Sequence, residues 1–128
     1  MICEIHLVPA EPAATVRPYT GLEGSSYERG SGSVDGARLA GRLRYSLCAR
    51  TDAEGEARVR LDGLITTSLG EFVSVHAHGL SRPDGFGLMT VSFVAQAEGL
   101  RWLNGLVGAG SLAFAPQGAR TLSTRAAG

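Results

Sequence analysis

The sequence contains no lysine, only two cysteines and no long hydrophobic run, and each of these absences narrows what the protein can do. All twelve basic residues are arginines, so Schiff-base catalysis through a lysine side chain is excluded. Cys3 and Cys48 lie outside any Cys-x-x-Cys motif, which predicts free thiols. No stretch approaches the roughly 18 apolar residues of a membrane helix, and residues 1–9 do not resemble a secretory signal. We therefore expect a cytoplasmic protein with no membrane partner.

Net charge is also lacking. The twelve arginines are balanced by twelve acidic residues, and no basic run stands apart from acidic ones along the chain. Proteins that bind nucleic acid gain most of their affinity from clustered basic residues that neutralise phosphates, so we expect no nucleic-acid partner. A length of 128 residues with 44% apolar residues predicts a single domain over residues 1–128.

What the chain does have is an alternation of apolar and polar residues with the period of a β-strand. Turn signals rich in Gly, Pro, Asp and Ser separate the alternating segments. This pattern predicts an all-β fold, a single antiparallel β-barrel of about seven or eight strands with one short helix near Trp102. The strands are expected at about residues 2–8, 39–49, 57–67, 71–79, 87–97, 107–115 and 119–124, and residues 10–33 are expected to be mostly loop with at most one short strand.

Hairpins centred on residues 53, 69 and 83 all place apolar residues opposite apolar residues, as a one-faced sheet requires. The first centre predicts Arg44 opposite Asp62 and Tyr45 opposite Leu61. The second predicts Asp62 opposite His76. The third predicts His76 opposite Thr90.

Three stretches carry recognisable motifs in a fixed order. Residues 32–43 contain G-x-x-L-x-G-x-L, residues 57–79 contain the Leu61-Asp62 pair, and residues 100–110 contain Trp102-Leu-Asn104. Together they resemble a bacterial family of small β-barrel proteins known only as a domain of unknown function. The resemblance implies a barrel and a recurring carboxylate at Asp62, and it implies no particular activity. The chain departs from the family by a shortened segment at residues 81–87 and by Leu64, His76 and His78, where the family tends to carry arginine.

The predicted row of Arg44, Asp62 and His76 is the main candidate for chemistry. A carboxylate beside an imidazole would orient the ring and make it a usable general base near neutral pH, so Asp62 and His76 are the predicted catalytic pair. The alternative is a ladder of opposite charges on the solvent face of the sheet, which would contribute little to stability. The same face carries Leu64, Phe72, Leu88 and Val94, so it could instead line a ligand cavity. Sequence periodicity leaves both interpretations open.

Six residues are predicted to bind substrate around this pair. Tyr45 is either a core aromatic residue or a phenolic donor in an apolar cavity. Trp102 and Asn104 either close one end of the barrel or present an amide to a ligand. The full predicted set is Arg44, Tyr45, Phe72, His78, Trp102 and Asn104.

His76 and His78 lie on one strand face, after Gly70, at a spacing that matches the opening of the cupin metal motif. The acidic ligand and the downstream histidine of that motif are missing, although His6 could complete a site of three histidines. We expect neither a bound metal nor a cofactor.

These residues favour a cofactor-free barrel that binds a small, partly apolar organic molecule and acts as an isomerase or cyclase, and natural-product biosynthesis is its expected setting. Holding a flexible substrate in a reactive conformation can by itself lower a barrier by several kcal/mol. The first alternative is a non-catalytic ligand carrier or structural barrel, with a homodimer through an exposed apolar face left open. The second alternative is a metal-dependent, cupin-like enzyme.

Overall fold

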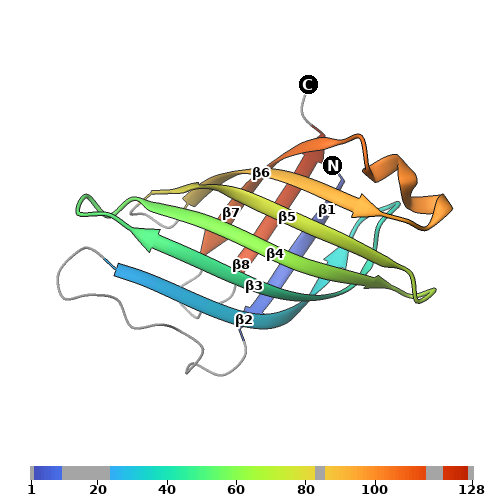
Figure 1. The fold of residues 1–128 in the computed structure, drawn as a ribbon, viewed down its shortest axis with the longest axis horizontal. Coiled ribbons are helices and arrows are strands. Elements are labelled where there is room, and N and C mark those ends of the chain that lie inside the picture. Colours follow the sequence, from blue (N-terminus) through green and yellow to red (C-terminus); the bar gives the residue numbers. More distant parts are fainter. Residues whose placement is uncertain (1, 10–23, 83–85, 115–119, 127–128) are drawn as a thin grey trace.

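The computed structural model describes residues 2–9, 24–82, 86–114 and 120–126, and these residues form a closed antiparallel β-barrel (Figure 1). Each strand pairs with the next one along the chain, and the first pairs with the last. The all-β fold class and the barrel are therefore confirmed. The strands are β1 Cys3–Pro9, β2 Gly24–Asp35, β3 Gly41–Thr51, β4 Ala57–Thr67, β5 Phe72–Ser81, β6 Phe86–Ala95, β7 Val107–Phe114 and β8 Arg120–Ala126.

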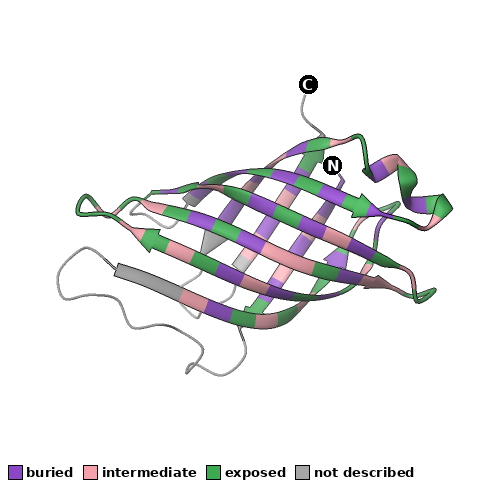
Figure 2. Ribbon diagram, viewed as in Figure 1, coloured by how far each residue is buried: buried purple, intermediate pink, exposed green. Residues whose placement is uncertain are grey.

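The alternation in the sequence decides which face of each strand is inside. In β3, Leu43, Tyr45 and Leu47 are buried, whereas Arg44 and Cys48, which point the other way, are exposed. Buried and exposed residues alternate in the same way along the neighbouring strands (Figure 2). The apolar face therefore points into the barrel, and the polar face points to solvent.

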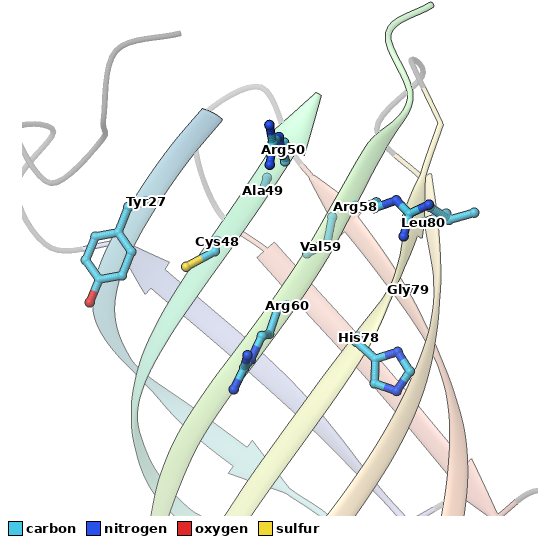
Figure 3. A pocket seen from close by; sticks show the side chains of 10 residues that line it. All are labelled: Tyr27, Cys48, Ala49, Arg50, Arg58, Val59, Arg60, His78, Gly79 and Leu80. Atoms are coloured by element: carbon cyan, nitrogen blue, oxygen red, sulfur yellow. The ribbon is translucent and has the colours of Figure 1, made fainter. Parts of the chain in front are cut away.

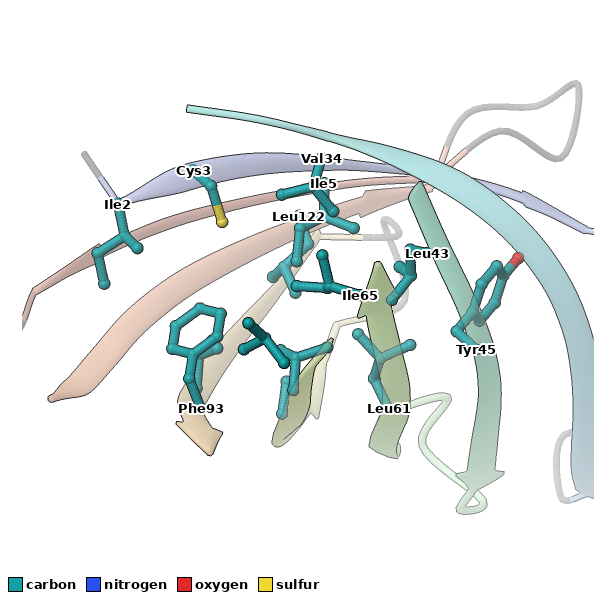
Figure 4. Packing of buried hydrophobic residues seen from close by; sticks show 14 of the residues in the cluster. Ile2, Cys3, Ile5, Val34, Leu43, Tyr45, Leu61, Ile65, Phe93 and Leu122 are labelled. Atoms are coloured by element: carbon teal, nitrogen blue, oxygen red, sulfur yellow. The ribbon is translucent and has the colours of Figure 1, made fainter. Parts of the chain in front are cut away.

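Apolar side chains from strands far apart in the sequence meet inside the barrel (Figure 4). Complete burial of one such side chain contributes about 1.5 to 3 kcal/mol. Barrels of eight strands have an interior just wide enough for side chains to fill. The largest fully buried side chains include Phe93, Ile5, Leu43, Leu61, Ile65 and Leu122.

The barrel closes where β1 pairs with β8, and the buried hydroxyl of Thr124 stabilises this contact. The backbone N–H of Cys3 donates to Thr124 Oγ1 at 3.2 Å, and that hydroxyl donates to the Cys3 carbonyl oxygen at 2.9 Å. Burial raises the pKa of the Cys3 thiol, and the side-chain hydrogen bond between the thiol and Thr124 partly offsets the rise. Cys3 is therefore a structural, unreactive thiol.

The 3-10 helix η2 (Glu98–Leu103) follows β6 and packs against it. Its Leu100 and Leu103 are buried and join the barrel core together with Leu39. A short helix near Trp102 is thus confirmed, and it covers the end of the barrel at which β6 finishes.

β2 differs from the expectation, because ten of its twelve residues, 24–33, belong to the segment predicted to be mostly loop. The polar, Gly-rich sequence of β2 has little intrinsic strand preference, so tertiary pairing with β1 and β3 overrides it. Glycine is needed at two inward positions. A Cβ at Gly30 would collide with the Val8 carbonyl oxygen, and one at Gly32 would collide with that of His6.

Two of the three predicted hairpin registers are wrong by two residues. Asp62 lies opposite His76 as predicted, but Asp62 lies opposite Ser46 rather than Arg44, and His76 lies opposite Ser92 rather than Thr90. The first hairpin is centred on residue 54 rather than 53, and Asp52 Oδ1 accepts the backbone N–H groups of Glu54 and Glu56 in its turn. A shift of two residues keeps every side chain on the same face of its strand, so the predicted inward and outward faces remain correct.

The close approach of β1 to β2 predicts that Gly32→Ala lowers the free energy of unfolding by about 1 to 3 kcal/mol, because its Cβ would force the backbone of β1 to move. Gly105→Ala is the control, since a Cβ there meets nothing within 4 Å. It should change stability by less than about 1 kcal/mol. Urea denaturation compares the two, and equal midpoints would contradict the tight β1–β2 contact.

Candidate functional site

The predicted acid–base pair forms on the outer face of the barrel, where β4 and β5 lie side by side. Asp62 Oδ1 and His76 Nδ1 are 2.6 Å apart. The second carboxylate oxygen of Asp62 accepts a hydrogen bond of 2.9 Å from Arg60 Nε. Asp62 is therefore held from both sides by groups that favour its ionised form.

These contacts lower the pKa of Asp62 below its ordinary value. The hydrogen bond from His76 is the largest cause, partial desolvation opposes it, and the charge and hydrogen bond of Arg60 add to it. An ionised carboxylate can only accept, so the ring must donate from Nδ1–H. In the neutral imidazole, Nε2 is then the nitrogen that can take a proton.

The pair does not project into the barrel interior. The side chains of His76 and Asp62 are 50% and 35% exposed. The hypothesis that this mixed face lines an internal cavity is wrong, because the apolar face fills the interior. Leu64, Phe72, Leu88 and Val94 are accordingly exposed on the outside. The catalytic role of the pair stays a prediction.

A shallow hollow of about 440 Å³ surrounds the pair on the outer surface. Arg44 lines it, although Arg44 lies opposite Leu64 and is therefore diagonal to Asp62. The hollow thus combines a carboxylate, an imidazole and guanidinium groups with an apolar side chain. Its other lining residues are Arg29, Gly30, Tyr45, Ser46, Gly63 and Leu64.

The remaining predicted binding residues on β5 lie apart from this hollow. His78 is exposed on the same face as His76 and lines a neighbouring hollow of about 650 Å³. The side chain of Phe72 is exposed at the start of β5 and lines neither hollow.

Trp102 and Asn104 lie at the η2 end of the barrel, and the described contacts of both are structural. The guanidinium carbon of Arg38 stacks 4.0 Å from the centroid of the Trp102 ring, which joins η2 to the β2–β3 connection. Asn104 Oδ1 accepts the backbone N–H of Ala95 at 2.6 Å, and Asn104 Nδ2 donates to the Ala95 carbonyl at 2.8 Å. The side chain of Asn104 therefore completes the end of β6. A role in ligand binding stays a prediction for both residues.

Sequence reasoning missed a buried carboxylate. Glu28 lies opposite Leu47 on the inward face of β2, and it is 7% exposed. Tyr45, which is also buried, donates its hydroxyl to Glu28 Oε2 at 2.8 Å. Tyr45 is thus a core aromatic residue whose hydroxyl is bonded to Glu28, and a role in substrate binding stays a prediction. Pairing of β2 with β3 would have revealed Glu28, but residues 10–33 were expected to be mostly loop.

The proposed contribution of His6 to a metal site is wrong. His6 is on β1, which lies across the closed barrel from β5, so His6 cannot join His76 and His78. His6 instead lies 3.2 Å from Glu4 and 3.5 Å from Asp35. Within the described ranges, no three metal-ligating side chains come together in a suitable arrangement.

The structure also gathers arginines that are scattered in the sequence. Arg42, Arg44 and Arg50 of β3 share the outer face with Arg58 and Arg60 of β4, and all five are exposed. Acidic side chains lie among them, since Arg60 bonds Asp62, and Asp52 and Glu56 line a hollow together with Arg50 and Arg58. The absence of a nucleic-acid partner stays a prediction.

No protein-family model and no curated protein matches the sequence. Solved structures share the fold. A protein of unknown function from Clostridium acetobutylicum ATCC 824 has a TM-score of 0.84 at 12% identity, with 99% of this chain and 97% of that chain covered. A β-barrel-like protein from Acinetobacter baumannii AYE has a TM-score of 0.81 at 15% identity, covering 96% and 90%. An enzyme from Penicillium herquei has a TM-score of 0.73 at 16% identity, covering 97% and 91%.

At these identities the likeness concerns the fold alone. The chain is a small β-barrel protein whose fold is shared by an enzyme, a protein of unknown function and a β-barrel-like protein. As for membranes, no helix among the described residues has the length and apolar character needed to span one.

The buried pair predicts that Tyr45→Phe lowers the free energy of unfolding by about 1 to 3 kcal/mol, because one hydrogen bond of the buried Glu28 carboxylate is lost. Tyr27→Phe is the matched control. Its hydroxyl accepts a hydrogen bond from Arg29 Nε on the exposed surface, so its loss should cost less than about 0.5 kcal/mol. Chemical denaturation measures both values. Equal costs would contradict a stabilising role for the interior pair.

The lowered pKa of Asp62 predicts a contribution to stability that depends on pH. Because the folded-state pKa lies below the unfolded-state value, the contribution is fully present above the ordinary aspartate pKa of about 4. This contribution to stability is lost as the pH falls through the lowered folded-state pKa of Asp62. Asp62→Asn should therefore reduce the melting temperature near neutral pH and match the unchanged protein at strongly acidic pH. A difference that grows towards acidic pH would overturn this assignment.

Proposed function

We propose that this barrel binds a small, partly apolar organic molecule on its outer face and isomerises or cyclises it without a cofactor. The observation that carries the proposal is the 2.6 Å contact between Asp62 Oδ1 and His76 Nδ1, within a hollow that also contains Arg44 and Leu64. The shared fold with an enzyme from Penicillium herquei supports catalysis on such a barrel. Specialised metabolism in the cytoplasm is the expected setting.

The residues of the hollow fit proton transfer next to a carbonyl group. His76 Nε2 takes a proton from the carbon beside the carbonyl while Asp62 holds the ring and stabilises the imidazolium. The electron pair of the broken C–H bond moves to the carbonyl oxygen, and the Arg44 guanidinium stabilises that negative charge. The imidazolium then returns the proton to a different carbon, which completes an isomerisation. If the enolate instead attacks a second carbonyl carbon of the same molecule, the π electrons of that carbonyl move to its oxygen, the oxygen takes the proton from the imidazolium, and a ring is formed.

A non-catalytic carrier is the second candidate, and the exposed apolar residues favour it. Phe72, Leu88 and Val94 are each more than half exposed on the outer face of β5 and β6. Such residues suit a ligand or a second copy of the chain, as in the predicted homodimer. A metal-dependent, cupin-like enzyme loses support because His6 lies across the barrel from the other two histidines.

Exchange of carbon-bound hydrogen tests the proposal. In D₂O, the protein should accelerate hydrogen exchange beside the carbonyl in partly apolar 1,3-dicarbonyl and enone compounds, measured by proton NMR. His76→Gln should reduce the enzymatic rate by about 100-fold or more, since the base is lost, and Asp62→Asn by about ten-fold or more.

His6→Gln is the matched control, because His6 is also an outer-face histidine beside carboxylates but lies across the barrel. The His6→Gln variant should catalyse hydrogen exchange at the same rate as the unchanged protein. The proposal fails if no compound exchanges faster than in buffer, or if His76→Gln retains the full rate.

A further inference from the structure

One cross-strand row on the outer face carries two arginines followed by two leucines. Arg50 of β3 lies directly opposite Arg58 of β4, and Arg58 lies opposite Leu80 of β5. Leu80 in turn lies opposite Leu88 of β6. The row is therefore cationic at one end and apolar at the other.

The cationic end is unfavourable for the folded protein by itself. Like charges directly opposite each other destabilise a sheet. Arg50 and Arg58 are both exposed, and in the described part of the chain neither forms an ion pair. Asp52 and Glu56 flank them at the turn, where the Asp52 carboxylate already accepts two backbone N–H groups. The two guanidinium groups are thus positioned to receive an external anion.

The apolar end is open to solvent. Leu80 is 55% exposed and Leu88 is 68% exposed, although they face each other across neighbouring strands. The hollow of about 650 Å³ is lined by Arg50, Arg58 and Leu80 (Figure 3). A second hollow, of about 480 Å³, is lined by Leu88. Both hollows are open to solvent, so they would hold a small molecule along the surface.

We propose that this row is a binding site for an amphiphilic monocarboxylate. The carboxylate lies between Arg50 and Arg58, whose guanidinium groups form charge-assisted hydrogen bonds with it. The apolar body crosses Leu80 and Leu88. Because neighbouring strands are about 4.8 Å apart, the path from β4 to β6 is about 10 Å long, which selects an extended chain or fused rings. The site goes beyond the proposed catalytic function and does not depend on it.

A cysteine in the hollow of about 650 Å³ makes occupancy of this hollow measurable by alkylation. Cys48 is exposed and lines the hollow beside Arg50, whereas Cys3 is buried in the barrel. A neutral alkylating reagent such as iodoacetamide should therefore modify Cys48 selectively. A ligand in the hollow should slow that modification.

The test compares three probes by calorimetry and by the rate of Cys48 alkylation. Octanoate has the charge and the apolar chain, octanamide has the chain alone, and acetate has the charge alone. Octanoate should bind at least about ten-fold more tightly than either and should protect Cys48, because only octanoate satisfies both ends of the row.

Variants assign the binding to this row. Arg58→Gln and Leu80→Ser should each weaken octanoate binding by about five-fold or more. Arg42→Gln is the matched control, since Arg42 is exposed on the same face of β3 but about 26 Å along the strand from Arg50. Arg58→Gln should keep or raise the melting temperature, because it removes a like-charge pair, so weaker binding cannot be attributed to unfolding.

The proposal is overturned if octanamide binds as tightly as octanoate, or if Arg58→Gln binds like the unchanged protein. It is also overturned if the protein binds vesicles containing anionic lipid or a single-stranded RNA while octanoate neither binds nor protects Cys48. His76→Gln should leave octanoate binding unchanged, so failure of this site and failure of the proposed catalysis are distinguishable.

Discussion

Pairing of β1 with β8 is the contact on which the rest of the barrel depends, because it converts an open sheet with two exposed edges into a closed one. The seam joins residues from the two ends of the chain. Thr124 anchors it by offering one buried hydroxyl to both the N–H and the C=O of Cys3. A side chain that satisfies two buried backbone groups holds the strands in one register, and a slip of one residue would turn every inward side chain outward.

Closure also decides where chemistry can occur. An eight-stranded barrel has room inside for packed side chains, and the inward residues here are mostly apolar. The Glu28–Tyr45 pair is an exception, and it is tolerated because the phenol donates to the carboxylate. Apart from Tyr45, the ionisable groups considered for catalysis and binding are on the outside, in shallow hollows between the side chains of neighbouring strands. The strands act as a rigid frame that fixes the spacing of these groups.

The two proposed sites share this construction. The Asp62–His76 pair and the row from Arg50 to Leu88 each arise from residues that face one another across strands. Arg60 connects the two areas, because it bonds Asp62 and also lines the hollow next to Arg50 and Arg58. A molecule held by the arginine row would therefore lie on the same face as the acid–base pair. The barrel presents cationic and apolar groups to solvent side by side, which suits amphiphilic anions.

The sequence by itself determined the barrel, the inward face of each alternating strand and the pairing of Asp62 with His76, because a period of two residues is a local property that any antiparallel pairing preserves. Only the tertiary structure decided β2, whose Gly-rich residues form a strand because β1 and β3 supply its partners. It also decided the two registers that shifted by two residues, the burial of Glu28 and the meeting of arginines from β3 and β4. These features depend on turn length and on contacts between distant segments, and the pattern along one strand holds no information about either.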